Sequence, residues 1–139
     1  MDLIDSKNYV DKAEAVIKEL IAEAKRSKRN PRNEEDYNIL STTQLRKQLA
    51  MTAEMFALAE NDNTDQLSHE LEDRIEYLRV QFVYQAGRDE YVKEFIEKAG
   101  ILQILKTING NKEDFITYCR YMEALVAFRK YHGNEDKER

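Results

Sequence analysis

The segment from Leu67 to Gly87, LSHELEDRIEYLRVQFVYQAG, repeats apolar residues at the period of an α-helix. One face of this helix would carry a continuous apolar stripe, made of Leu67, Leu71, Ile75, Leu78 and Phe82. The run Asn63-Thr64-Asp65-Gln66 has the spacing of a capping box, and Gly87 is typical of a helix end. We therefore expect a long amphipathic helix over about 63–87 that packs one face against the rest of the chain.

Further amphipathic segments lie on both sides of this helix. One covers about Tyr9 to Lys25, and another begins at the capping box Ser41-Thr42-Thr43-Gln44 and runs to about Ala59. After Gly87 the pattern predicts a short helix interrupted at Gly100, an apolar ridge that ends at the turn 109–111, and a last helix over about 112–131. No strand is needed, so the sequence predicts an all-α fold, a single compact helical bundle of about five or six helices.

The composition fits one domain over residues 1–139. Hydrophobic residues make up 42% of the chain and charged residues 35%, and no apolar run exceeds 124–128, which excludes a membrane span. We expect a flexible charged loop near 26–38, around the single Pro31, and a charged tail over 133–139. The acidic N-terminus lacks the pattern of a signal peptide and the chain has 1 cysteine, so we expect a cytoplasmic protein.

The charges are unevenly distributed along the chain. The net charge of −5 argues against binding nucleic acid by bulk charge alone. Acidic residues are concentrated in 1–24 and 60–76, however, and the remainder of the chain is mildly basic. A cationic face is therefore possible, and the acidic stretch over 60–76 is expected to face away from any phosphate.

The residue types of common catalytic and metal sites are scarce. Cys119 falls on the apolar stripe of the last helix, which favours a buried core thiol over a reactive nucleophile. The Glu-x-x-His pattern of metal-binding helical bundles is missing at both His69 and His132. We therefore expect no enzyme activity, no metal and no cofactor. An enzyme that uses Cys119 would instead have a thiol open to alkylation in the native protein.

One polar face is a candidate for binding. On the helix over 63–87 and just beyond it, side chains opposite the apolar stripe share one acid-free face: Arg74, Tyr77, Gln81, Tyr84, Gln85 and Arg88. Arginine fits phosphate, and glutamine and tyrosine can bond phosphate, sugar or 2′-hydroxyl groups. Alternatively, the tyrosines pack under the following short helix, or the face docks a protein partner.

Other basic residues differ in how well their positions are explained. Arg46 and Lys47 lie in the first turn of their helix, where a cation opposes the helix dipole, so an anionic ligand would account for them. Arg129 and Lys130 lie near a helix C-terminus, where basic groups are stabilising without any ligand.

Three segments together resemble a known family. They are LSTTQLRKQL at 40–49, YLRVQFVYQAGR at 77–88 and YCRYMEALVAF at 118–128. In order and spacing they are similar to the small subunit of the type III-A CRISPR effector, the Csm complex. The basic loop over 25–32 does not align with these segments and is interpreted as a linker or as an extra contact.

The resemblance implies a noncatalytic helical subunit, several copies of which stack along the guide RNA and its paired target RNA. Its implied protein partners are other copies of itself, the backbone subunit and the large subunit. In that family the backbone subunit cuts the target RNA, and the large subunit cleaves single-stranded DNA and makes cyclic oligoadenylate. The residues implied for RNA binding are Arg46, Lys47, Arg79, Arg88 and Arg120, with Gln81 and Gln85. The alternative is a helical protein–protein adaptor without RNA contact, in which the face around Tyr77, Gln81 and Tyr84 docks another helix.

Overall fold

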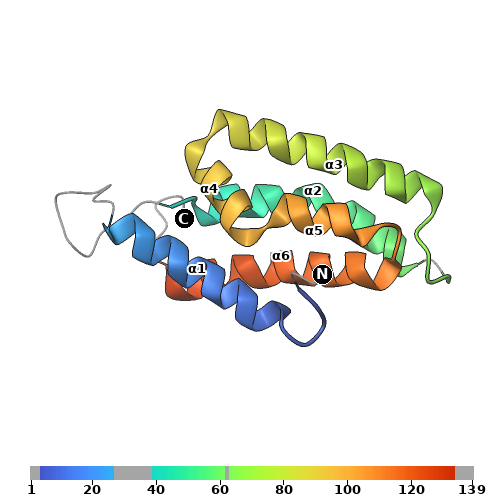
Figure 1. Ribbon diagram of the computed structural model, residues 1–139, viewed down its shortest axis with the longest axis horizontal. Helices are drawn as coiled ribbons and strands as arrows, with labels where there is room; N and C mark the ends of the chain where they lie inside the picture. Colours follow the sequence, from blue (N-terminus) through green and yellow to red (C-terminus); the bar gives the residue numbers. More distant parts are fainter. Residues whose placement is uncertain (1–3, 27–38, 62, 134–139) are drawn as a thin grey trace.

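A computed structural model describes residues 4–26, 39–61 and 63–133, and these residues form six α-helices (Figure 1). The helices are α1 (Tyr9–Arg26), α2 (Thr42–Glu60), α3 (His69–Arg88), α4 (Glu90–Ala99), α5 (Ile101–Ile108) and α6 (Lys112–His132). The predicted all-α fold is confirmed for this part of the chain, which contains no strand. None of the described helices is long and apolar enough to cross a membrane.

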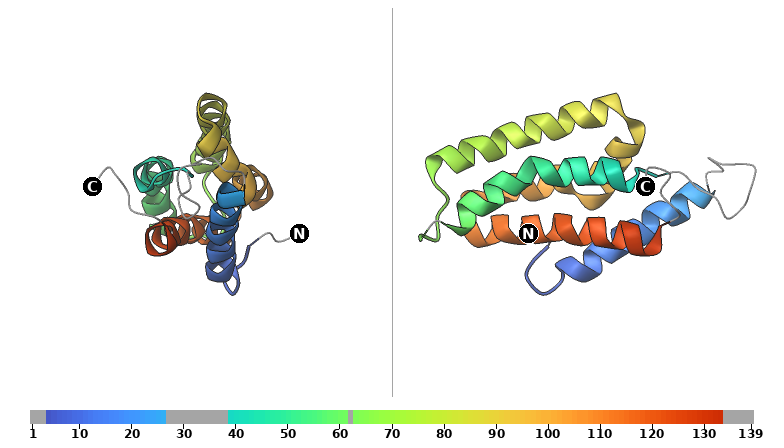
Figure 2. Two further views of the ribbon diagram at one scale, coloured as in Figure 1. Left: turned by 90° about the vertical axis from the view of Figure 1, so that its left-hand side faces the viewer. Right: turned by 180° about the vertical axis from the view of Figure 1, so that it is seen from behind.

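The C-terminal helix organises the bundle. α6 packs along both α1 and α2, and α3 lies at the outer edge opposite α6, with α4 and α5 folding back between them (Figures 1 and 2). All six helices contribute side chains to the core. Buried core side chains of α6 are Phe115, Tyr118, Cys119, Tyr121, Met122 and Leu125. Every member of the predicted stripe, from Leu67 to Phe82, is buried as well.

Polar contacts attach α1 to both ends of this core. Lys98 of α4 donates to Glu23 at 2.6 Å, and the pKa of Lys98 is raised mainly by that hydrogen bond. On α6, Nε2 of His132 lies 2.5 Å from a carboxylate oxygen of Glu14. α1 is thereby fixed against α4 and against the end of α6.

Most of the predicted helix limits agree with the structure. The capping box is present: Ser41 Oγ accepts from the Gln44 amide at 3.1 Å, and Gln44 Oε1 accepts from the Ser41 amide at 3.0 Å. The two long terminal helices each extend one residue beyond the predicted end, to Arg26 and to His132. Gly100 separates α4 from α5, as predicted, with a left-handed φ of 70°.

The predicted start of the third helix is wrong. α3 begins at His69 with Ser68 as its N-cap, and residues 63–68, where the helix was predicted to start, are not helical. The Leu67 amide donates to the Gly110 carbonyl at 2.8 Å, and the Lys112 amide donates to the Asp65 carbonyl at 3.0 Å. These bonds form a short antiparallel bridge between Gln66 and Asn111, which holds the backbone extended.

The predicted charged loop and tail fall largely outside the described residues. Arg26 is the last residue of α1 and Gly133 follows the end of α6, and 27–38 and 134–139 are not described.

Candidate nucleic-acid interface

The start of α2 and the end of α3 meet at one hydrogen bond between side chains. The Gln44 amide group donates from Nε2 to Asp89 Oδ2 at 2.7 Å. Asp89 Oδ1 accepts from the Tyr91 amide at 2.8 Å and so caps α4. Since Gln44 also completes the capping box of α2, this pair of side chains joins the ends of three helices.

Two of the basic residues predicted to bind RNA, Arg46 and Lys47, follow Gln44 closely on α2. Arg46 and Lys47 are exposed, and the first turn of α2 contains no acidic residue. The prediction that they lie in the first turn is wrong, because α2 begins at Thr42 and both residues fall in its second turn. The first turn is already capped by Ser41 and Gln44. The two exposed cations suit a phosphate group mainly through their own charge and hydrogen-bond donors.

Arg88 reaches the same junction from α3. It is exposed, precedes Asp89, and its guanidinium carbon lies 5.6 Å from the centroid of the Tyr84 ring. Gln85, one turn earlier, is half-buried. The structure thus brings Arg88 and Gln85 to the end of the bundle where Arg46 and Lys47 lie.

A groove between α2 and α3 lies along the first half of α3, away from this end. Gln81 lines it, with Met51 and Met55 of α2. Arg74 lines it too, but its guanidinium is paired with Glu70 at 3.2 Å and Glu54 at 3.6 Å. The positive character of the polar face is therefore confined to its C-terminal end.

Arg79 lies on a different flank of α3 from Gln81. Successive residues of a helix are separated by about 100° around its axis, so Arg79 and Gln81 point about 160° apart. The Arg79 guanidinium is half-buried and bonded to Glu76 at 2.8 Å. The structure does not bring Arg79 together with the cations of α2.

Arg120 also lies apart from that group. It is exposed on α6, and its guanidinium carbon is 6.0 Å from the centroid of the Phe56 ring. Phe56 is ten residues after Arg46 on α2, which corresponds to about 15 Å along the helix. Arg120 thus belongs to the α2–α6 side of the molecule.

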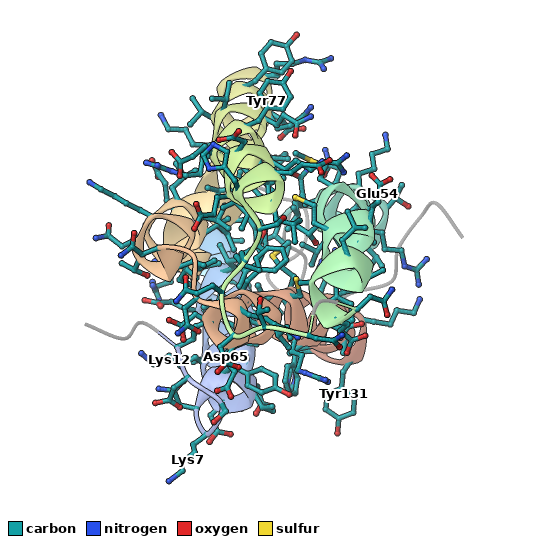
Figure 3. The ribbon with its side chains drawn as sticks, turned by 90° about the vertical axis from the view of Figure 1, so that its right-hand side faces the viewer. Lys7, Lys12, Glu54, Asp65, Tyr77 and Tyr131 are labelled. Carbon is teal, nitrogen blue, oxygen red and sulfur yellow. The ribbon has the colours of Figure 1, made fainter. Side chains whose placement is uncertain are left out.

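The tyrosines of the polar face do not pack under α4. Tyr77 and Tyr84 have exposed fractions of 64% and 62%, which overturns the alternative in which α4 covers them. Figure 3 shows Tyr77 pointing outward from α3. The side chains remain available to a ligand or to another protein.

Most acidic residues of α3 lie in its first half. The last of them, Glu76, precedes Arg88 by twelve residues, or about 18 Å along the helix axis. Asp89 and Glu90 follow Arg88 directly, so this cation has acidic residues on its C-terminal side.

Cys119 and Arg129, which are nucleophilic and basic side chains, are both buried in the bundle. The Cys119 thiol is buried, as predicted, and its pKa is raised mainly by burial. Arg129 is buried as well, and its Nε donates to the Leu40 carbonyl at 2.8 Å. The position of Arg129 near a helix end gave no signal of this contact, because Leu40 is distant in the sequence.

The described residues contain no cluster of three or more potential metal ligands.

Comparison with known proteins identifies a family. The model of the family described as Csm2 Type III-A matches residues 13–135. A protein of Streptococcus thermophilus named CRISPR system Cms protein Csm2 is 41% identical over 136 residues, which cover 98% of this chain and 100% of the relative. Relatives of the same name from Mycobacterium tuberculosis (strain H37Rv) and Enterococcus italicus are 43% and 34% identical, over 70% and 86% of this chain and 79% and 88% of their own.

Proposed function

The chain belongs to the type III-A Csm2 family, and from this we propose that it is the noncatalytic small subunit of a type III-A CRISPR effector. In this role it holds the backbone of the duplex between guide RNA and target RNA. Its partners are both RNAs, further copies of itself, and the backbone and large subunits, in the cytoplasm.

One observation carries the proposal of RNA binding. Arg46 and Lys47 at the start of α2 and Arg88 at the end of α3 come from separate segments, and the Gln44–Asp89 hydrogen bond joins those segments. An exposed group of basic side chains fits phosphate, and it recognises no base. Such binding suits an effector in which base pairing supplies the sequence information.

The remaining proposed contacts extend this group along the molecule. Gln81 and Gln85 offer amide groups on the α3 side, where they can bond phosphate or 2′-hydroxyl groups. Arg120 and Arg79 lie on other flanks, so each would contact a different stretch of RNA or an adjoining subunit. We propose that catalysis resides in the neighbouring subunits.

A second candidate function is favoured by the exposed tyrosines. In this alternative, α3 docks a helix of a protein partner through Tyr77, Gln81 and Tyr84, without RNA contact. Ultraviolet crosslinking distinguishes the two. Nucleotides crosslinked to peptides containing Arg46 or Arg88 support RNA binding, and crosslinks confined to proteins support the adaptor.

The quantitative test replaces Arg46 and Arg88 together by alanine in the assembled effector. We expect weaker binding of target RNA and a salt dependence of log K shallower by about 2, because about one counterion is released per phosphate contact. The matched control replaces Lys7 and Lys12, exposed near the start of α1 (Figure 3), and keeps the full slope. An unchanged slope in the Arg46/Arg88 variant would remove both residues from the interface.

A further inference from the structure

The groove between α2 and α3 is large and open to solvent. Its volume is about 470 Å³, within the range of roughly 300–1,000 Å³ that is typical of binding clefts. Figure 3 shows Glu54 on α2 and Tyr77 on α3, the two helices that border it, and both side chains are exposed. We call it the α2–α3 groove, and its lining includes Met51, Glu54, Met55, Glu70, Asp73 and Tyr77.

The α2 side of this groove is apolar. Met55 is buried, and Met51 is half-buried. Leu58 follows Met51 by seven residues and so lies on the same flank of α2, where it is 44% exposed and extends the apolar strip. Flexible methionine side chains adapt to the shape of a partner, and surfaces rich in them recur where proteins bind other proteins. The α2 side therefore suits the apolar part of a protein side chain.

The rim of the α2–α3 groove is acidic. Glu54, Glu70 and Asp73 all have exposed side chains. Among the described residues that line the groove, Arg74 is the only base, and its guanidinium pairs with Glu70 and Glu54. Three carboxylates and one guanidinium give the lining a formal charge of −2. The Asp73 carboxylate has only a longer contact, 3.8 Å, with the exposed His69. The rim thus repels phosphate and attracts a cation.

Arginine is the protein side chain that matches this combination of surfaces. Its methylene stem packs on apolar side chains, its planar guanidinium stacks on an aromatic ring, and its donors fit a carboxylate. Tyr77 follows Asp73 by four residues, so the two side chains share one flank of α3. A single guanidinium at this flank can therefore contact both the ring and the carboxylate.

We propose that the α2–α3 groove docks a neighbouring protein subunit of the effector through an arginine side chain of that subunit. The arginine lies between Tyr77 and Asp73, and apolar side chains next to it cover Met51 and Leu58. This proposal rests on membership of the effector, which the family shows, and not on the RNA contacts proposed above.

The docking surface and the proposed RNA interface lie at different places on α3. Asp73 precedes Arg88 by fifteen residues, or about 22 Å along the helix axis. The subunit therefore binds protein and RNA at the same time. In this respect the proposal differs from the adaptor alternative, in which α3 binds protein without RNA contact.

Photo-methionine, incorporated into this chain alone, tests the contact inside the assembled effector. After ultraviolet activation we expect crosslinks from Met51 to one arginine-containing peptide of another protein subunit. The matched control Met51→Leu/Met55→Leu keeps the apolar volume and the other methionines, of which Met122 is fully buried, and should lose these crosslinks. Crosslinks to RNA, to a second copy of this chain or to a peptide without arginine would overturn the proposal, as would crosslinks that persist in the control.

Charge reversal tests the energetics of docking. Asp73→Lys should weaken binding of the fluorescently labelled chain to an effector assembled without it about tenfold, because it places like charges together. Glu123→Lys, at an exposed residue of α6, is the matched control and should bind as the wild type does. Replacing the crosslinked arginine of the partner by glutamate should restore binding of the Asp73→Lys chain. Equal binding of Asp73→Lys and wild type, or a failure of this restoration, would contradict the proposal.

The docking proposal and the RNA proposal can fail separately. Arg46→Ala/Arg88→Ala should weaken RNA binding and leave the methionine crosslinks unchanged. If the salt dependence of RNA binding does not change in that variant while the crosslinks persist, only the RNA contacts are refuted. If the crosslinks disappear in that variant, the groove does not dock protein independently of RNA, and the docking proposal is refuted.

Discussion

At the scale of single residues, the Cys119 thiol shows how burial controls reactivity. Its pKa is raised mainly by burial and further by Glu123. Because the thiolate is the nucleophile, we predict that iodoacetamide alkylates native Cys119 at pH 8 at least about 100-fold more slowly than an exposed thiol. Mass spectrometry of timed samples measures the rate.

Two variants control this measurement. Val10→Cys supplies an exposed thiol in the same protein, and Glu123→Gln should change the Cys119 rate only slightly, since burial is the larger cause. Equal alkylation rates at residues 10 and 119 would show a reactive Cys119 and would support the hypothesis of an enzyme that uses this thiol.

Residue roles were predictable where the sequence pattern itself specifies burial. Cys119 lies on an apolar stripe, and the stripe placed it correctly in the core. Arg129 follows the same helix, yet its buried contact with the Leu40 carbonyl depends on how α6 packs against the segment before α2. A charged residue whose partner is distant in the chain has no local signal.

At the scale of helices, Asp89 is the connection with the most consequences. It caps α4 and accepts a hydrogen bond from Gln44, so Asp89→Ala should lower the free energy of unfolding by about 2 kcal/mol. Ser41→Ala, which removes one cap only, should cost about 1 kcal/mol. Urea denaturation compares the two.

The conservative variant Asp89→Asn separates capping from charge, because asparagine is also a good N-cap. It should retain most of the stability. If Asp89→Ala were as stable as the wild type, the junction of the three helix ends would have no role in holding the end of α3 against the start of α2.

Helix limits were predictable where capping is local, as at Ser41 and Gly100. The start of α3 was not, because the run 63–66 has capping residues but its backbone pairs with residues 110–112. The Gly110 φ of 80° shapes the partner turn. Tertiary hydrogen bonds therefore replaced a helical turn that local preferences favoured.

At the scale of the whole molecule, two buried tyrosine hydroxyls and one buried thiol should make the folding stability decrease at alkaline pH. Burial raises the pKa of Tyr118, Tyr121 and Cys119, whereas in the unfolded chain these groups ionise near their ordinary values of about 10 and 8.5. Above those values the unfolded chain releases protons that the native chain retains. Stability should therefore fall with rising pH, by about 1.4 kcal/mol per pH unit for each group that has ionised.

Tyr118→Phe tests this prediction. The Tyr118 hydroxyl has no hydrogen-bond partner among the described residues, so the variant should be as stable as the wild type near pH 7. Between pH 10 and 11 it should lose about 1 kcal/mol less than the wild type. Urea titrations at several pH values measure the difference, and parallel pH profiles for the two proteins would contradict the assigned cause.

The candidate site was predictable in its residue types and only partly in its arrangement. Helical spacing placed Gln81, Gln85 and Arg88 on one face, and the dipole argument singled out Arg46 and Lys47. That the start of α2 meets the end of α3 follows from the packing of the two helices, which no local pattern reports. The same packing separates Arg79 and Arg120 from them.

The bridge between residues 65–67 and 110–112 has a consequence for how such proteins can diverge. It brings the two ends of the α3–α5 segment within hydrogen-bond distance. Between these ends, α3–α5 also bury their apolar faces against α1, α2 and α6. Any exchange of this segment between relatives would therefore have to match both the short base and the packing surface of the other three helices.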